Sequence, residues 1–529
     1  GRPCRALETL EDLRGAIRRS AAPRVRGVYG AEAAILATTD GARCGNLSRH
    51  VKIDAEPPLL GGVIVPLPRV RKTPEEDEGV EVEHEVAHVR PPRPGPPTSV
   101  TPVAPGAPYA TGSDPFAFTT LSAIGQGIFG IPEEPSQATA GRVVWYTGNS
   151  GGAAYSLDGG ATFKKVDPRE VAPEGDNAFC CDQVVVYAPQ INRFIWYIQY
   201  WCRGADLYCE SPGNSNLGRL LVASPEEIRK DPVGAWTTWT LRPGMLGHPG
   251  VFLDYPDLGV GTNSLYVTMN MFKGDGFTGS LAARVPLADL KAGRALDMRF
   301  YRDPHAGTFK VVQGLRSRAF LATQSRNTKL MTLSWDERSP LLMRHHTPHA
   351  VSADTDYESP TGAAGGVDWG ERSDARITAA TLRGDELWLA WPEGRDICTD
   401  RCVRFWPQPH VHVAVIDSRT WRLRRERFIH NPSFAIGFPS LATDARGRVG
   451  LSFSYGSGTA GNASPAAGYL TGGEAFRQVA RSPGAGYQGD YFSLRPDWPN
   501  GNRFVGTGYV TDRGGEHVRW LYYRYSRPR

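Results

Sequence analysis

From about residue 115 to the end, the chain alternates short apolar segments with turns at intervals of about 50 to 60 residues. Each unit opens with a short apolar segment, turns, and continues with a segment rich in aromatic residues, a pattern that predicts paired β-strands. The seven units contain residues 141–163, 182–187 with 194–198, 254–258 with 265–268, 309–321 with 330–333, 375–380 with 387–391, 439–442 with 449–453, and 490–494 with 503–509.

A recurrence of this length, with about four strands in each unit, predicts an all-β fold of the β-propeller type with seven blades, because one blade alone cannot bury both of its faces. The 60 glycines, 42 prolines and 10% aromatic residues agree with a turn-rich β protein. Six or eight blades and a pair of β-sandwiches are the alternatives, and the recurrent inner strand favours the propeller.

The first part of the chain does not share this pattern. Residues 1–55 predict a small separate unit with one short amphipathic helix over 7–17, closed by a Cys4–Cys44 bridge. Residues 56–114 are rich in proline and predict an extended arm or linker. The propeller is expected to occupy residues 115–529.

The eight cysteines occur in near pairs, which favours disulfides and an extracellular or cell-surface location. Zinc bound by thiolates is the competing interpretation, but two matched Cys-x-x-Cys motifs are absent. The sequence contains no run of eighteen apolar residues, so it does not predict a membrane-spanning helix. The pairs are Cys4 and Cys44, Cys180 and Cys181, Cys202 and Cys209, and Cys398 and Cys402.

One turn has a specific motif. Ser156-Leu157-Asp158-Gly159-Gly160-Ala161-Thr162-Phe163 reads Ser-x-Asp-x-Gly-x-Thr-aromatic and resembles the Asp box of BNR-repeat, sialidase-like β-propellers. Asp158 is expected to bond amides of its own turn, and the two glycines to adopt positive φ. An ordinary hairpin with a polar turn is the alternative. In the family that it resembles, the box is structural and lies away from the active site, so it argues for the fold.

Segments 181–185, 252–258 and 489–491 also resemble a group of secreted bacterial propeller proteins without an assigned function. Sialidases use three arginines, an aspartic acid and a tyrosine paired with a glutamate. Tyr357-Glu358 and Tyr255-Asp257 are candidate pairs, but the Arg-Ile-Pro motif of that family is absent near the first unit.

Three units open with an acid just ahead of the inner strand: Asp182, Asp254 and Asp490. On a propeller these positions face the axial channel at one end, and Tyr255 and Tyr491 lie beside two of them. The acids could hold a cation such as calcium, supply paired carboxylates for glycoside cleavage, or simply cap the strand entries through local backbone bonds.

Histidine motifs give further metal candidates. His84-Glu85-Val86-Ala87-His88 matches the His-Glu-x-x-His pattern of zinc proteases, but the valines and prolines around it predict extended chain instead of the required helix. The groups His345-His346-x-x-His349 and His410-x-His412 could ligate a metal, and alternation along a strand puts His410 and His412 on one face.

The sequence favours an extracellular or cell-surface propeller that binds a glycan or protein partner, with the N-terminal arm tethering it to a neighbour or a larger assembly. A carbohydrate-active hydrolase or lyase, with its site at the axial mouth, is the alternative. A net charge of +5 spread over 529 residues, without a basic block, argues against a nucleic-acid partner.

Overall fold

The computed structural model describes residues 37–38, 43–47, 49–54, 98–99, 117–126 and most of 134–527. Within the last range, the segments that fall outside the description are 150–151, 174–176, 204–213, 275, 327–328, 350–368, 371–372, 395–407, 457–461, 473–474, 485–490 and 512–517.

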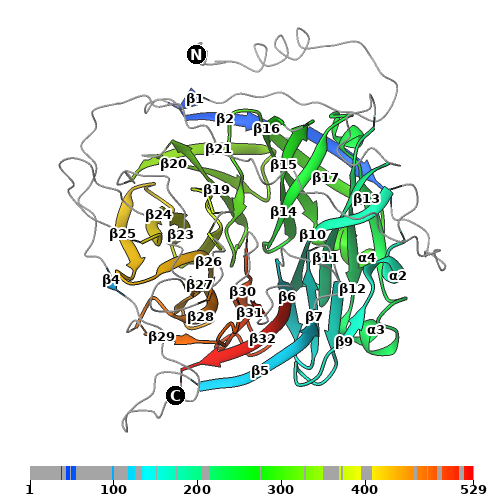
Figure 1. Cartoon of the computed structure of the whole chain (residues 1–529). Helices are drawn as coiled ribbons and strands as arrows, with labels where there is room; N and C mark the ends of the chain where they lie inside the picture. Colours follow the sequence, from blue (N-terminus) through cyan, green and yellow to red (C-terminus); the bar gives the residue numbers. More distant parts are fainter. Residues whose placement is uncertain are drawn as a thin grey trace, which may run out of the picture.

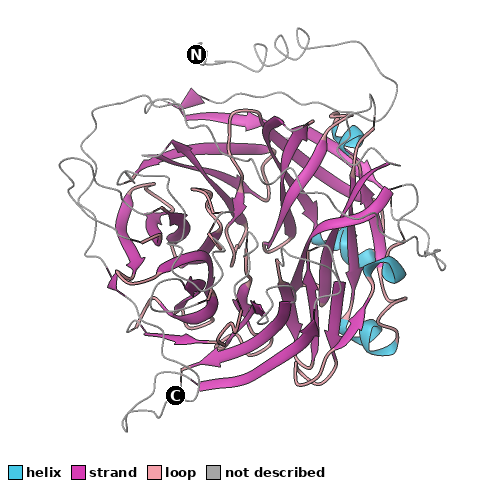
Figure 2. Cartoon of the chain, viewed as in Figure 1, coloured by secondary structure: helices cyan, strands magenta, loops and turns pink. Residues whose placement is uncertain are grey.

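Seven β-sheets are arranged in a ring around a central axis, so the chain is a seven-bladed β-propeller (Figure 1). Figure 2 shows that strands dominate and that the few helices lie at the periphery. The first four strands of each blade run antiparallel to their neighbours, and the first strand named for each blade below is the innermost (Figure 1). The prediction of fold and blade number from the recurrent strand pairs is confirmed.

The first three blades are built as follows. Blade 1 contains β6 (Ser136–Ala140), β7 (Val143–Gly148), β8 (Gly152–Ser156) and β9 (Lys164–Val166). Blade 2 contains β10 (Asn177–Ala188), β11 (Arg193–Arg203), β12 (Leu217–Ala223) and β13 (Thr237–Leu241). Blade 3 contains β14 (Phe252–Val260), β15 (Ser264–Lys273), β16 (Gly276–Pro286), β17 (Leu296–Asp303) and, at its outer edge, β3 (Arg49–Ile53).

The remaining blades continue the ring. Blade 4 contains β18 (Lys310–Val311), β19 (Arg318–Arg326), β20 (Lys329–Asp336), β21 (Leu341–Pro348), β2 (Arg43–Leu47) and β1 (Ala37–Thr38). Blade 5 contains β22 (Ala379–Arg383), β23 (Glu386–Glu393), β24 (His410–Asp417), β25 (Leu423–His430) and β4 (Thr98–Ser99). Blade 6 contains β26 (Ala435–Thr443), β27 (Val449–Gly456), β28 (Ser464–Tyr469) and β29 (Ala475–Gln478).

The ring is closed by a blade made from both ends of the propeller sequence. Blade 7 contains β30 (Leu494–Pro496), β31 (Phe504–Thr511), β32 (Val518–Ser526) and β5 (Ala117–Gln126). The outermost strand, β5, precedes blade 1 in the sequence and pairs antiparallel with β32. Main-chain hydrogen bonds between the two ends of the propeller sequence therefore hold the ring shut.

Segments that the sequence places in the N-terminal unit and the arm add outer strands to three blades. β3 pairs with β17, β2 pairs with β21, and β4 pairs parallel with β25. Val51 and Ile53 of β3 are buried in the same apolar core as blades 2 and 3. Residues 43–47 and 49–53 are thus part of the propeller's outer edge, whereas the expected helix over 7–17 and Cys4 lie outside the described residues.

Large aromatic side chains fill the spaces between adjacent blades. Between blades 1 and 2, Trp145, Trp196 and Trp236 form a triangle with ring centroids 4.7 to 5.4 Å apart. Tilted and edge-on arrangements at this spacing are favourable for aromatic rings. The aromatic second strands that mark the repeat in the sequence therefore build the contacts between blades.

Close to the axis, polar side chains link the innermost strands of neighbouring blades. In four places, a side-chain oxygen on one inner strand accepts a hydrogen bond from a backbone N–H on the next. The acceptors are Ser136 from Val185 (3.1 Å), Asp257 from Val311 (2.9 Å), Ser440 from Leu494 (3.0 Å) and Ser493 from Gln137 (3.2 Å).

The helices are short and lie between strands: α2 (Pro168–Val171), α3 (Pro225–Lys230), η2 (Pro243–Leu246) and α4 (Leu287–Ala292). Ser224 and Glu227 form a reciprocal capping box at the start of α3. Among the described residues, no helix has both the length and the apolar character needed to cross a membrane.

The turn between β8 and β9 has the hydrogen bonds expected from its sequence. Asp158 Oδ1 accepts from the backbone amides of Ala161 and Thr162, each at 3.0 Å, and from the Ser156 hydroxyl at 2.7 Å. Gly159 and Gly160 have φ of +85° and +88°. Hydrogen bonds from Thr162 and Ser156 hold the pKa of the Asp158 carboxyl well below its usual range. The acid therefore stays ionised and fixes the turn.

Cys180 and Cys181 form a disulfide between adjacent residues, and Cys202 is also disulfide-bonded. These three cysteines pack with Trp201, Phe252 and Phe272 at the entry to blades 2 and 3. No free cysteine occurs in the described part of the chain. The proposed Cys4–Cys44 and Cys398–Cys402 pairs involve residues outside it.

Candidate functional site at the axial mouth

One face of the ring contains the starts of the innermost strands, and we call it the entry face. Because successive strands are antiparallel, the ends of the second and fourth strands and the starts of the third strands lie on this same face. Asp182 and Asp254 lie at the irregularities near the starts of the inner strands β10 and β14, so they belong to the entry face. The turn of Asp158 joins a third strand to a fourth strand and lies on the opposite face.

Three inner strands are distorted at the entry face in the same way. β10, β14 and β26 each have a register shift there, beside a residue with φ near +50°: Cys181 (52°), Tyr255 (49°) and Phe438 (51°). A bulge of this kind redirects the side chains around it, and an aromatic residue with positive φ is strained. The bulges therefore change the direction of Asp182 and of Asp254 relative to a regular strand.

A chain of amide side chains connects the acids of the axial mouth. The Asn149 side chain donates to Glu134 and, at 3.1 Å, to Asp182 Oδ1. The Asp182 backbone N–H donates to Gln199 Oε1 at 3.3 Å, and Gln199 Nε2 donates to Asp254 Oδ1 at 2.6 Å. Glu134 and Asp182 are fully buried, and Asp254 is 6% exposed. Carboxylates from the first three blades thus share one hydrogen-bonded network.

Aromatic and cationic groups border this network. The rings of Tyr255 and Tyr491 meet edge to face with centroids 5.7 Å apart. The guanidinium of Arg376 lies 4.8 Å from the Tyr255 ring centroid and pairs with Asp374 at 2.7 Å. Arg376 and Tyr491 precede the inner strands of blades 5 and 7, so residues from five blades meet around the axis.

The electrostatics single out Asp254. Burial raises the pKa of its carboxyl to about 6, opposed by the bonds from Gln199 and from the Tyr255 backbone, while the charge of Glu134 adds to the increase. Arg376 acts in the opposite direction. A carboxyl that titrates near pH 6 can hold or release a proton close to neutrality, which is the property required of a general acid.

Four of the five expected site residues come together at this face: Asp182, Asp254, Tyr255 and Tyr491. Asp490 lies outside the described residues, as does the candidate pair Tyr357-Glu358. The sequence interpretation missed Glu134, Asn149, Gln199 and Arg376. Asn149 directly follows the second strand of blade 1, and Gln199 lies in the second half of the second strand of blade 2. A polar residue towards the entry-face end of a second strand is therefore the signal that could have revealed them.

The candidate histidines of the His345-His346-x-x-His349 group do not lie together in the structure. His345 is stacked on Trp421 with ring centroids 3.5 Å apart and is hydrogen-bonded to Ser334, while the neighbouring His346 is exposed. His349, directly after β21, instead joins His412 of blade 5. The stretch 84–88 lies outside the described residues.

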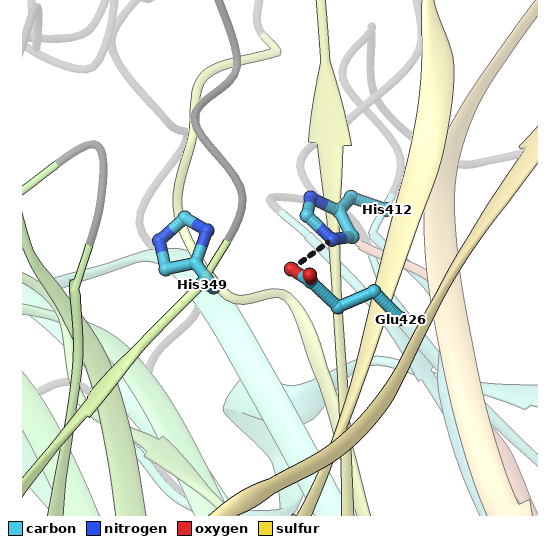
Figure 3. Close-up of side chains that lie close together, drawn as sticks. All are labelled: His349, His412 and Glu426. Carbon is cyan, nitrogen blue, oxygen red and sulfur yellow. Dashed lines mark hydrogen bonds and ion pairs between the residues drawn. The ribbon is translucent and has the colours of Figure 1, made fainter. Parts of the chain in front are cut away.

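A cluster of histidines and glutamates lies between blades 4 and 5 at the entry face. His412 Nδ1 bonds to Glu393 at 2.7 Å and its Nε2 bonds to Glu426 at 2.9 Å. His410 Nε2 bonds to the other oxygen of Glu393 at 3.1 Å. Figure 3 shows His349 facing the His412–Glu426 pair from the opposite side. Donor atoms of His349, His412 and Glu426 all lie within 4.8 Å of one another. The described carboxylates of the axial mouth do not form a comparable group.

The face opposite the entry face contains a polar recess between blades 3 and 4. Its volume is about 380 Å³, and its lining includes Arg284, Arg299, Arg338, Asp297 and Glu337. None of the residues singled out in the sequence lines this recess.

No family model matches the chain, and no curated protein matches its sequence. Similar solved structures include a protein of unknown function from Dyadobacter fermentans, with 12% identity, 78% of this chain and 100% of that chain covered, and a TM-score of 0.36. An α-L-arabinofuranosidase from Fusarium graminearum has 10% identity, coverage of 76% and 97%, and a TM-score of 0.37. A leech intramolecular trans-sialidase has 11% identity, coverage of 77% and 70%, and a TM-score of 0.36.

At such identities and TM-scores, these likenesses give no guide to the activity of this chain. Its function has to be argued from its own side chains.

Proposed function

We propose that this propeller is an extracellular or cell-surface protein that binds a glycan at the axial mouth of its entry face. The observation that supports this best is the network of Glu134, Asp182 and Asp254 with the amides of Asn149 and Gln199. Carboxylates and amides offer acceptors and donors for sugar hydroxyls, and a few fixed polar groups beside aromatic rings are typical of small-ligand sites.

The proposed contact region is defined by the groups that retain some exposure. Asp254 is 6% exposed, Tyr491 8% and Arg376 9%. A sugar entering along the axis would meet these three first, and the Asn149 and Gln199 amides behind them would keep the acids in place.

The disulfide between Cys180 and Cys181, together with the bonded Cys202, supports an oxidising location.

Part of the N-terminal segment has a structural role in addition to the tethering role expected from the sequence. β2, β3 and β4 pair with the propeller's own outer strands, so these parts of the segment brace the ring. Only the parts of the arm outside β2, β3 and β4 would then serve to tether the protein to a neighbouring subunit.

Glycoside cleavage is the second candidate, and the raised pKa of Asp254 favours it. A carboxyl with a pKa of about 6 keeps its proton at mildly acidic pH and can donate it to a leaving-group oxygen. A second carboxylate would then act on the sugar ring or on water, and Asp182 and Glu134 are the acids nearest in the network. A lyase would use the same acids for proton transfer.

A glycan array probed with the intact chain tests both candidates. Asp254→Asn keeps the shape and removes the charge, and Asp297→Asn, at an exposed position on the opposite face, is the matched control. Binding that Asp254→Asn weakens at least tenfold, without product, supports the binding function. Release of shorter sugars by the wild type and not by Asp254→Asn supports the hydrolase or lyase. Equal glycan binding by all three proteins, or none, would overturn the proposed site.

A further inference from the structure

The cluster between blades 4 and 5 is distinct from the axial mouth, because its acids and histidines lie on the second, third and fourth strands of blade 5 (β23, β24 and β25) and directly after β21 of blade 4. His349 is 2% exposed, His412 0% and Glu426 1%. These polar groups have almost no contact with solvent, so each must be stabilised by the side chains around it.

We propose that His349, His412 and Glu426 form a zinc site. Two imidazole nitrogens and one carboxylate oxygen are a donor set that Zn²⁺ uses in proteins, usually with a fourth position left for water or another ligand. The three donor atoms lie within 4.8 Å of one another. Tetrahedral bonds of about 2.1 Å would hold them about 3.4 Å apart, a change that small side-chain rotations can supply.

Glu393 fits the role of a positioning residue behind His412. Its Oε1 accepts from His412 Nδ1 at 2.7 Å and from Trp391 Nε1 at 3.2 Å, and its Oε2 bonds to His410 at 3.1 Å. A carboxylate that holds the Nδ1–H of a histidine leaves Nε2 as the ligand atom, which is the usual arrangement behind metal-bound histidines. In this cluster, Nε2 of His412 is the atom that faces Glu426.

A divalent cation would balance the buried charges of the cluster. Glu393 and Glu426 bring two negative charges into a buried space, where unpaired charge is costly. Without a metal, both His412 and His410, which bonds to Glu393, would have to be protonated to offset the two charges. A Zn²⁺ ion would offset both with the two histidines neutral.

The rival arrangement is a metal-free network in which an imidazolium at His412 bridges the two carboxylates. Burial alone lowers the pKa of His412, but the charge of Glu393 and the bonds to both carboxylates raise it to about 9. Both arrangements use the same side chains, so metal content has to decide between them.

The test is the zinc content of the intact protein, purified without a polyhistidine tag, stripped with a chelator and reloaded with zinc chloride. We expect one zinc per chain by elemental analysis. His349→Ala should abolish stoichiometric binding, while His346→Ala, an exposed position on β21 three residues away, should leave it unchanged. Glu393→Gln should weaken zinc affinity about 10- to 100-fold, measured by competition with a coloured chelator.

Loading with Co²⁺ gives a readout that does not depend on any variant. Bound to two nitrogens and a carboxylate in a near-tetrahedral site, Co²⁺ should show visible absorption bands that zinc displaces. Wild-type protein that takes up well below one equivalent of zinc and gives no such bands would overturn the proposal. So would zinc binding that His349→Ala and His346→Ala reduce equally, with both variants folded by circular dichroism.

Discussion

Gln199 on β11 donates a 2.6 Å hydrogen bond from its side-chain amide to the carboxylate of Asp254 on β14, the inner strand of the next blade. The same side chain accepts from the backbone N–H of Asp182 at 3.3 Å. One buried amide therefore connects two of the three acids that the sequence puts forward, and it fixes their separation across the blade boundary.

Replacing Gln199 with leucine should disturb both acids. The substitution keeps similar volume but removes the donor to Asp254, and a buried polar group that loses its partner costs about 1 to 3 kcal/mol. Because the Gln199 bond lowers the pKa of Asp254, that pKa should rise above about 6. Urea unfolding and a carboxyl titration by NMR measure the two effects. Gln190→Leu, at an exposed amide, is the control, and equal losses of stability in the two variants would contradict this view.

The pH dependence of stability should contain a contribution from Asp254. Its folded pKa of about 6 lies above the ordinary value of 3.8, so the folded state holds the proton more tightly than the unfolded state does. The resulting stability is fully present below pH 4 and is lost as pH rises to about 6. Over this window, wild type should lose about 3 kcal/mol relative to Asp254→Asn. Unfolding free energies at several pH values give this difference, and a constant difference from pH 4 to 7 would show that the pKa is not raised.

The two glycines of the turn at Asp158 should respond differently to alanine. Both have positive φ, so each substitution strains the backbone by about 1 to 2 kcal/mol. A Cβ at Gly160 would lie 2.3 Å from the Tyr522 ring, whereas the atom nearest to one at Gly159 would be the end of the Arg524 side chain, at 3.5 Å. Gly160→Ala should therefore cost a further 1 to 3 kcal/mol, roughly, for the clash with a packed ring. Denaturant unfolding of the pair measures this, and equal losses would mean that the ring moves aside freely.

The outer strand β3 should contribute to the stability of the propeller. Ile53 is 3% exposed and packs with the core of blades 2 and 3, while Lys52 between it and Val51 is exposed. Ile53→Ala should cost about 2 to 5 kcal/mol, and Lys52→Ala should stay within about 0.5 kcal/mol. Thermal and urea unfolding of the whole chain measure both values. An Ile53→Ala variant with unchanged stability would mean that β3 does not contribute to the stability of the propeller.

The sequence predicts the ring well because most blades repeat an apolar inner strand and an aromatic second strand, and both signals are local. The prediction is less complete at the edges. Arg49–Ile53 has only two buried apolar side chains among polar neighbours, so its partner strand β17, some 250 residues away, leaves no local trace. The inner strand of blade 1, Ser136–Ala140, is small and polar in sequence and precedes the first expected unit.

The candidate sites follow the same logic. Asp182 and Asp254 could be placed because they recur just ahead of the regular part of two inner strands, where each strand has its register shift. Asn149, directly after β7, and Gln199, on β11, bind these acids, and their role depends on how adjacent blades are packed. His349 and His412 belong to different blades and are 63 positions apart. They come together because the two blades pack against each other, and no local sequence motif reveals this contact.

The pairing of β5 with β32 also has a consequence for the order of synthesis. A ribosome delivers β5 before the first blade and β32 after the last, so β5 must wait for nearly the whole chain before its partner exists. Until then the growing protein is an open arc with exposed strand edges at both ends, the form of a β protein that is most exposed to mispairing. The ring is therefore completed in a single late step, after translation has passed the last strand.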